Sequence, residues 1–128
     1  RTARAVPMKV IVCGGRGFDP MIVQSWLSLS ATTALGAPIT CVVHGGAWGA
    51  DFGAAKWARQ HNVAAVAYPI TPADWKRLGR KAGPLRNQRM LDEQKPDAVV
   101  AFPGGRGTGD MMRRAEKAGV AVIVAMRS

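Results

Sequence analysis

Residues 102–110 of the chain, Phe102-Pro-Gly-Gly-Arg-Gly-Thr-Gly-Asp110, decide how the rest of the sequence is interpreted. The apolar run at 97–101 before this stretch is typical of a buried strand, and residues 111–118 after it are typical of a helix. A strand, a glycine-rich turn and a helix in this order direct unpaired backbone N–H groups at an anion. Thr108 can cap the helix or donate its hydroxyl to a phosphate. The stretch therefore indicates a phosphate site, and a tight turn without a ligand is the alternative.

Two further glycine turns follow predicted strands. Residues 14–18 come after a strand expected at 8–13, and residues 44–51 come after a strand expected at 39–43. Asp19 and Pro20 predict the N-cap and first residue of a helix that continues to about residue 34. The spacing of its apolar residues predicts a buried face that carries Ile22, Trp26 and Leu29. Another helix is expected from about residue 50 to 61.

Strands at 63–68 and 120–124 complete an alternation of apolar strands and helices. This alternation predicts an α/β fold: a single Rossmann-like, doubly wound domain with a five-stranded parallel sheet and helices on both faces. We expect the strand order 3-2-1-4-5. In that order the turns at 14–18 and 103–108 meet at the switch point, where such folds bind ligands, and the turn at 44–51 opens on the same edge.

The composition is that of one globular domain. The chain has 128 residues, of which 48% are apolar and 20% charged, so we expect a domain over 8–128 preceded by a flexible N-terminal extension at 1–7. No apolar run is long enough to span a bilayer, and we expect no membrane partner. Cys13 and Cys41 have neither metal-ligand nor C-x-x-C spacing, which favours free thiols in a reducing cytoplasm.

The formal net charge of +10 implies anionic partners. Part of this charge lies between Lys76 and Arg89, where no acidic residue interrupts the basic ones. Thr71-Pro72-Ala73-Asp74 predicts the start of a short helix before this segment, and a second helix is expected to begin near Pro84. The basic segment can contact a phosphate, bind nucleic acid weakly or form a solvated face, and the sequence leaves these alternatives open.

Familiar nucleotide fingerprints are absent. The first turn has Pro20 at the third glycine position of G-x-G-x-x-G, and His44 stands where a ribose-binding acid is expected. No Gly-Lys-Ser/Thr follows any of the turns, which argues against a kinase or ATPase. The sequence contains no cluster of potential metal ligands, so we expect neither a metal nor a cofactor.

The turn at 102–108, together with residues 83–90 (Gly-Pro-Leu-Arg-Asn-Gln-Arg-Met), resembles the SLOG superfamily. This superfamily contains the LOG phosphoribohydrolases, the DNA-processing protein DprA and the YpsA-type proteins, and the small YspA/YpsA-related branch of bacteria and phages is the most similar. Residues 8–18, 44–51, 73–90 and 97–112 share the resemblance. It implies a Rossmann-like domain that binds a nucleotide or a nucleotide-derived molecule, such as a nucleoside monophosphate or an ADP-ribose-like ligand. By analogy it also implies a homodimer.

The resemblance further suggests which reaction to consider. LOG enzymes release a base from its ribose phosphate with an Arg and a Glu; the Arg matches Arg86, but the Glu position falls on Met111. Asp110 is adjacent, although one step along a helix turns it by about a quarter turn. Relatives often carry Arg where this chain has Trp48, which trades a phosphate contact for base stacking.

Three functions follow from these patterns. The first is a module that binds a nucleotide-type ligand as a sensor, carrier or sequestering protein. The second is a phosphoribohydrolase (N-glycosidase) that uses Arg86 and Asp110 as catalytic residues. The third is a single-strand nucleic-acid binder of the DprA type, with Trp48 and Trp75 as stacking platforms. The expected ligand-binding residues are Gly14, Gly15, Arg16, Gly17, Phe18, His44, Gly45, Gly46, Trp48, Asp51, Trp75, Arg86, Asn87, Pro103, Gly104, Gly105, Arg106, Gly107 and Thr108.

Overall fold

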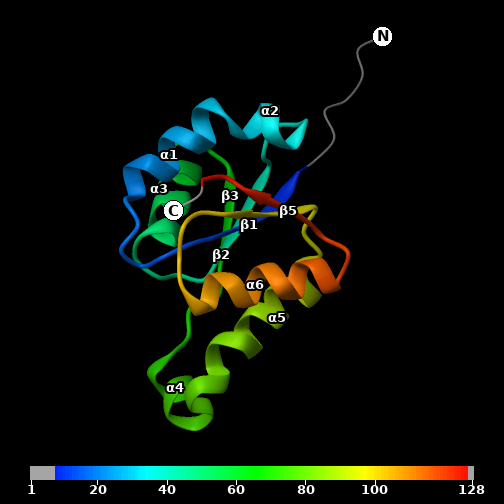
Figure 1. The fold of residues 1–128 in the computed structure, drawn as a ribbon. Coiled ribbons are helices and arrows are strands. Elements are labelled where there is room, and N and C mark those ends of the chain that lie inside the picture. Colours follow the sequence, from blue (N-terminus) through cyan, green and yellow to red (C-terminus); the bar gives the residue numbers. More distant parts are fainter. Residues whose placement is uncertain (1–7, 127–128) are drawn as a thin grey trace.

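Five parallel strands form one sheet in the computed structural model, which describes residues 8–126 (Figure 1). The extension expected at 1–7 lies outside the described residues. In chain order the elements are β1 (Lys9–Cys13), α1 (Pro20–Leu29), α2 (Ala31–Leu35), β2 (Cys41–His44), α3 (Ala50–Gln60), β3 (Ala64–Ala67), α4 (Pro72–Leu78), the 3-10 helix η1 (Gly79–Lys81), α5 (Ala82–Gln94), β4 (Ala98–Ala101), α6 (Arg106–Lys117) and β5 (Ala121–Val124).

The strand order is β3-β2-β1-β4-β5, and each neighbouring pair is parallel, as predicted. The register of the central strand is shown by Val10, which lies opposite Val42 on one side and Ala98 on the other. In Figure 1, α1, α2 and α3 cover one face of the sheet, and α5 and α6 cover the other. All five strands end at the same edge, so the segments that follow them are collected there.

Alternate residues of the central strands supply two separate cores. Val10 and Val12 face the layer of α1 and α3, where Trp57 and Phe102 belong to the same cluster. Ile11 of the same strand faces the layer of α5 and α6. Successive side chains of a strand point to opposite faces, and helices cover both faces of this sheet. The continuous apolar runs are explained by this double burial.

The first helical segment differs from the sequence prediction. It is interrupted at Ser30, whose N–H still donates to the Trp26 carbonyl, and α2 begins at the next residue. Trp26 packs edge-on against Phe102 in the core as expected, but Leu29 is 83% exposed. The buried face carries Val23 and Leu27 instead.

A close helix contact selects that face of α1. A Cβ atom on Gly53 of α3 would lie 2.7 Å from the Pro20 carbonyl oxygen and 2.9 Å from Val23 Cβ. The missing side chain therefore lets α3 approach α1 directly over Val23, which turns Ile22 and Leu29 toward the surface. This glycine lies in another helix, so the periodicity of α1 alone does not reveal the contact.

The segment α4–η1–α5 extends below the sheet in Figure 1. Thr71 and Asp74 form the expected capping box, with Asp74 N–H donating to Thr71 Oγ1 at 3.0 Å and Thr71 N–H donating to Asp74 Oδ2 at 3.3 Å. Neither α4 nor η1 has a buried residue. Helix α5 begins at Ala82, two residues before Pro84, because a proline in the first turn removes only an N–H that has no partner within the helix.

Candidate functional site

The three glycine turns are joined to one another at the carboxyl edge of the sheet. Gly15 N–H donates to the Pro103 carbonyl at 2.8 Å, and Ala50 N–H donates to the Gly15 carbonyl at 3.2 Å. A Cβ atom on Gly14 would lie 2.6 Å from Ala50 Cβ, so the turns come this close only because a glycine is present where they cross. The predicted convergence of the turns is therefore a direct backbone contact.

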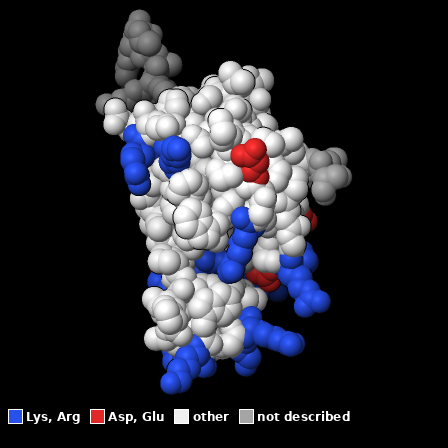
Figure 2. Space-filling view, turned by 90° about the vertical axis from the view of Figure 1, so that its left-hand side faces the viewer, with Lys and Arg blue, Asp and Glu red and all other residues white. Residues whose placement is uncertain are grey.

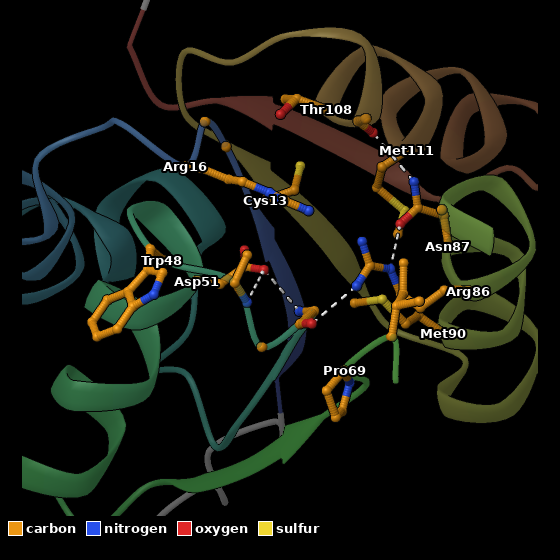
Figure 3. Close-up of a pocket in the computed structure, with 18 of the residues that line it drawn as sticks. Cys13, Arg16, Trp48, Asp51, Pro69, Arg86, Asn87, Met90, Thr108 and Met111 are labelled. Carbon is orange, nitrogen blue, oxygen red and sulfur yellow. Dashed lines mark hydrogen bonds between the residues drawn. The ribbon is translucent and has the colours of Figure 1, made fainter. Parts of the chain in front are cut away.

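A cavity of about 450 Å³ opens between these turns and α5. Figure 2 looks toward this edge of the molecule, and Figure 3 shows the side chains around the cavity. Among the residues expected to bind a ligand, those that line the cavity are Gly14, Gly15, Arg16, Gly45, Gly46, Trp48, Asp51, Trp75, Arg86, Asn87, Gly105, Gly107 and Thr108.

The other expected ligand-binding residues do not line the cavity. They are Gly17, Phe18, His44, Pro103, Gly104 and Arg106. Phe18 packs against Phe102, with ring centroids 5.6 Å apart, and the Pro103 carbonyl accepts the hydrogen bond from Gly15. Several of these residues therefore shape the turns rather than the cavity wall.

Sequence reasoning missed part of the wall. The additional lining residues are Val12, Cys13, Ala47, Pro69, Ile70, Gly83, Met90 and Met111, and of these the sequence places only Met111 at a functional position, that of the family glutamate. Cys13 ends β1 immediately before the first turn, a position that could have indicated it. Burial, with a smaller effect from the charge of Asp51, raises the pKa of the Cys13 thiol to about 12, so this cysteine is a neutral wall residue and not a nucleophile.

Arg86 is the most firmly held cation of the cavity. Its Nη1 donates to the carbonyls of Gly45 at 2.9 Å and Tyr68 at 3.1 Å, and its Nε donates to Asn87 Oδ1 at 3.1 Å (Figure 3). A Cβ atom on Gly45 would lie 2.5 Å from Nη1, so the guanidinium occupies the space that the glycine leaves. Burial lowers the Arg86 pKa while the carboxylate of Asp51 raises it, and a guanidinium stays charged at neutral pH.

Asn87 connects Arg86 to α6. Its Nδ2 donates to the Gly107 carbonyl at 3.2 Å and to Asp110 Oδ2 at 3.0 Å. The same Asp110 oxygen accepts from Arg114 Nε at 2.9 Å, and Asp110 does not line the cavity. Asp110 thus orients Asn87, and through it Arg86, instead of facing a ligand.

Asp51 is a buried carboxylate in the first turn of α3. It is 7% exposed, and its Oδ2 accepts hydrogen bonds from Gly45 N–H at 3.1 Å and Ala47 N–H at 3.2 Å. Burial raises its pKa, and the two N–H donors and the Arg86 charge oppose that rise without cancelling it. The carboxylate braces the second turn and lines the cavity at the same time.

His44 lies behind this turn. It is 7% exposed, and its Nδ1 accepts from Gly46 N–H at 3.0 Å, which assigns the ring proton to Nε2. Burial lowers the pKa of His44, and the charge of Arg86 lowers it further, so the imidazole is neutral. The hydrogen bond of His44 is therefore made to the backbone of the second turn, and the side chain does not line the cavity.

The N-terminus of α6 is open toward the cavity. The helix begins at Arg106 with Gly105 as its N-cap, and its first turn contains no acidic residue and no side-chain cap. Of the two roles expected for Thr108, helix capping does not occur, because Gly105 is the N-cap and Thr108 is the third helical residue. Thr108 lines the cavity, and its hydroxyl forms no hydrogen bond with any of residues 8–126.

Two indole rings stand at the cavity margin. Trp48 is 72% exposed and packs on Phe52 with ring centroids 5.1 Å apart, and Trp75 of α4 is 42% exposed. At this exposure Trp75 is not part of the buried core. Further from the cavity, basic side chains project from the lower end of the molecule in Figure 2, where α4 and η1 lie.

Two kinds of feature are absent from the described part of the chain. Within residues 8–126, no three His, Cys, Asp or Glu side chains are grouped so that they could hold a metal ion. The same residues form no helix with the length and apolar character needed to cross a membrane.

Fold and cavity together define a doubly wound α/β domain with glycine turns gathered at its switch point. A family model described as "YspA, cpYpsA-related SLOG family" matches residues 8–78, more than half of the chain. The chain therefore belongs to this family, and the resemblance inferred from the glycine turns is confirmed.

Two individual proteins are also similar to the chain. The Gene 61 protein of Mycobacterium phage D29 is 47% identical over 88 residues, which cover 64% of this chain and 68% of that protein. The crystal structure of the DNA processing protein DprA from Streptococcus pneumoniae matches with 19% identity and a TM-score of 0.48, over 91% of this chain and 58% of that one. The chain thus spans little more than half the length of the solved DprA chain.

Proposed function

We propose that the cavity binds a nucleotide or a nucleotide-derived ligand, a nucleoside monophosphate or an ADP-ribose-like molecule, and that the protein acts as a sensor, carrier or sequestering protein. One observation carries this proposal: three glycine turns, the open N-terminus of α6 and two arginines surround a single cavity. A volume of about 450 Å³ lies within the range of small-molecule sites.

The phosphate group of the ligand belongs at the α6 end of the cavity. The N–H groups of the first turn of α6 lack helical partners, and no acidic side chain in that turn competes for them. Thr108 offers a hydroxyl beside them. Arg86 retains Nη2, which has no hydrogen-bond partner among residues 8–126, and Arg16 adds a second guanidinium. These groups suit a phosphate.

The base of the ligand belongs at the aromatic margin. Trp48 and Trp75 both line the cavity and both leave a large part of the ring accessible. An accessible indole can stack on a base without hydrogen-bonding to it, so this margin tolerates different bases.

The lining of the cavity favours binding over hydrolysis. Met111 is 1% exposed at the cavity wall and cannot ionise, and the Asp110 carboxylate is engaged with Asn87 and Arg114. Asp51 is the carboxylate that remains at the wall, and its Oδ2 is occupied by two backbone N–H groups. The cavity wall therefore lacks the free carboxylate that residue 111 would supply as a general acid or general base for cleavage of the bond between nucleobase and ribose.

A second candidate function is the binding of single-stranded nucleic acid. It is favoured by the basic side chains on α4 and η1 near the exposed ring of Trp75. Such a surface can follow a phosphate backbone while the indole stacks on a base. Those basic side chains are Lys76, Arg77, Arg80 and Lys81.

The cavity is tested by a pair of glycine variants. A Cβ atom on either Gly105 or Gly17 would meet nothing within 4 Å, but only Gly105 lines the cavity. Mass spectrometry of the native protein first identifies any co-purified small molecule, and a nucleoside monophosphate panel is titrated in parallel. We expect Gly105→Val to abolish binding and Gly17→Val to retain it, with both variants folded by circular dichroism. Equal affinity of the two variants would refute the assignment of this cavity.

A further inference from the structure

Two helix N-termini meet at the same cavity and differ in charge. The first turn of α6 contains no acid, whereas the first turn of α3 contains Asp51. A helix N-terminus favours an anion, and α3 already holds one from its own chain. The α6 end is therefore the end that is open to an anion from a ligand, because the α3 end already holds the Asp51 carboxylate.

The Asp51 carboxylate has one occupied oxygen and one free oxygen. Oδ2 accepts from Gly45 and Ala47, whereas Oδ1 forms no hydrogen bond with any of residues 8–126. None of the described side chains has a fully buried polar atom without a partner, so Oδ1 is accessible, and the residue borders the cavity (Figure 3). An ionised carboxylate oxygen can only accept a hydrogen bond, so a ligand group there must be a donor.

A carboxylate at this position is energetically unfavourable, because burial removes most of the water that would solvate its charge. Only 7% of Asp51 is exposed. Burial raises its pKa, although the N–H groups of Gly45 and Ala47 and the charge of Arg86 act in the opposite direction. An asparagine could brace the same two N–H groups with its oxygen. The turn alone therefore does not require a charge, and perturbed carboxylates of this kind concentrate at functional sites.

Arg86 and Asn87 connect the two ends of the cavity. Arg86 donates to Gly45, next to the brace made by Asp51, and Asn87 donates to Gly107 in the first turn of α6. A ligand that contacts both ends must carry an anionic group and a hydrogen-bond donor in one molecule. A sugar phosphate has this arrangement.

We propose that Asp51 is a specificity-determining residue whose free oxygen accepts a hydrogen bond from a ribose hydroxyl of the ligand, so that the site selects ribonucleotides over their deoxy counterparts. This inference rests on the proposed function. A hydrogen bond to a charged group corresponds to a preference of about tenfold or more.

The first test compares sugars in the unmodified protein. The four ribonucleoside 5′-monophosphates are titrated beside their 2′-deoxy and 3′-deoxy forms, with tryptophan fluorescence or calorimetry as the readout. We expect at least one ribonucleotide to bind about tenfold or more tightly than one of its deoxy forms. Equal affinities for all three sugars would overturn the role of Asp51 and leave the proposed function intact. If neither a ribonucleoside monophosphate nor ADP-ribose, titrated in parallel, binds, both proposals fall.

The second test uses Asp51→Asn with Asp19→Asn as the matched control. Asp19 is the N-cap of α1, so its replacement makes the same change in charge away from the cavity. We expect Asp51→Asn to reduce the sugar preference to about twofold or less, while Asp19→Asn retains it. A preference that persists in Asp51→Asn, or a change in base preference alone, would overturn the assignment to a sugar hydroxyl.

A third measurement distinguishes lost recognition from a damaged turn. Inorganic phosphate competes with the bound ribonucleotide at the α6 end, and Asp51→Asn removes a nearby negative charge. We expect the variant to bind inorganic phosphate as tightly as the unmodified protein or more tightly. Weaker phosphate binding together with lost nucleotide binding would show that Asp51 acts only as a brace, and would overturn the proposal.

Discussion

Replacement of Arg86 by alanine tests the centre of the proposed site. The side chain has one group available for a ligand, Nη2, because Nη1 and Nε are bound to Gly45, Tyr68 and Asn87. A charge-assisted hydrogen bond from Nη2 to a phosphate contributes about 1.5–3 kcal/mol, so Arg86→Ala should weaken ribonucleotide binding by roughly 10- to 150-fold. A contact inside the cavity is poorly screened, so the loss should be similar at low and high salt.

The same substitution has a cost in stability that must be measured separately. The carbonyls of Gly45 and Tyr68 each lose a donor, and one hydrogen bond contributes about 0.5–1.5 kcal/mol. We therefore expect the free energy of unfolding of Arg86→Ala to fall by about 1–3 kcal/mol in urea denaturation, with part offset by relief of the buried charge. Binding is then compared under conditions in which both proteins are fully folded.

Lys76→Ala is the control, because Lys76 is an exposed basic residue on α4 and does not line the cavity. Each variant is titrated with a ribonucleotide and with a short single-stranded DNA at about 50 and 500 mM salt. We expect Lys76→Ala to change nucleotide affinity little. If both variants lose DNA affinity equally with a steep salt dependence, and neither changes nucleotide affinity, the reasoning is refuted and the nucleic-acid function is favoured.

Three further predictions concern chemistry at the cavity wall. Because Met111 stands where the resemblance places the glutamate of the phosphoribohydrolases, we expect no release of free base from nucleoside monophosphates over hours; rapid release that requires Arg86 and Asp110 would establish an enzyme. Because its pKa is about 12, the Cys13 thiol should resist alkylation at pH 8 in the folded protein and react in urea, as followed by mass spectrometry. Burial raises the pKa of Asp51 in the folded protein above 3.8, so the folded state holds this proton more tightly than the unfolded state. The resulting contribution to stability is complete below pH 3.8 and is lost as the pH rises through the raised pKa. Denaturation of Asp51→Asn should therefore show a smaller loss of stability between about pH 4 and 7 than the unmodified protein, and identical pH profiles would contradict the raised pKa.

The position of the cavity at one edge of the sheet could be predicted because it depends on chain order. Apolar runs identify strands that are buried on both faces, and the glycine turns follow three of them directly. Right-handed connections between parallel strands then leave few topologies, all of which bring these turns to the carboxyl edge. The capping box of α4 was equally accessible to prediction, because its hydrogen bonds join residues three apart in the sequence.

The sequence by itself determined the parallel sheet, its strand order and the edge that carries the glycine turns, since these follow from local periodicity and connection rules. Only the tertiary structure decided which atoms of the turns face the cavity and which face one another. Phe18 packs into the core and Asp110 pairs with Arg114, whereas Cys13 and Met90 reach the cavity wall. Such contacts join residues far apart in the chain, and they depend on close backbone approaches that periodicity does not encode.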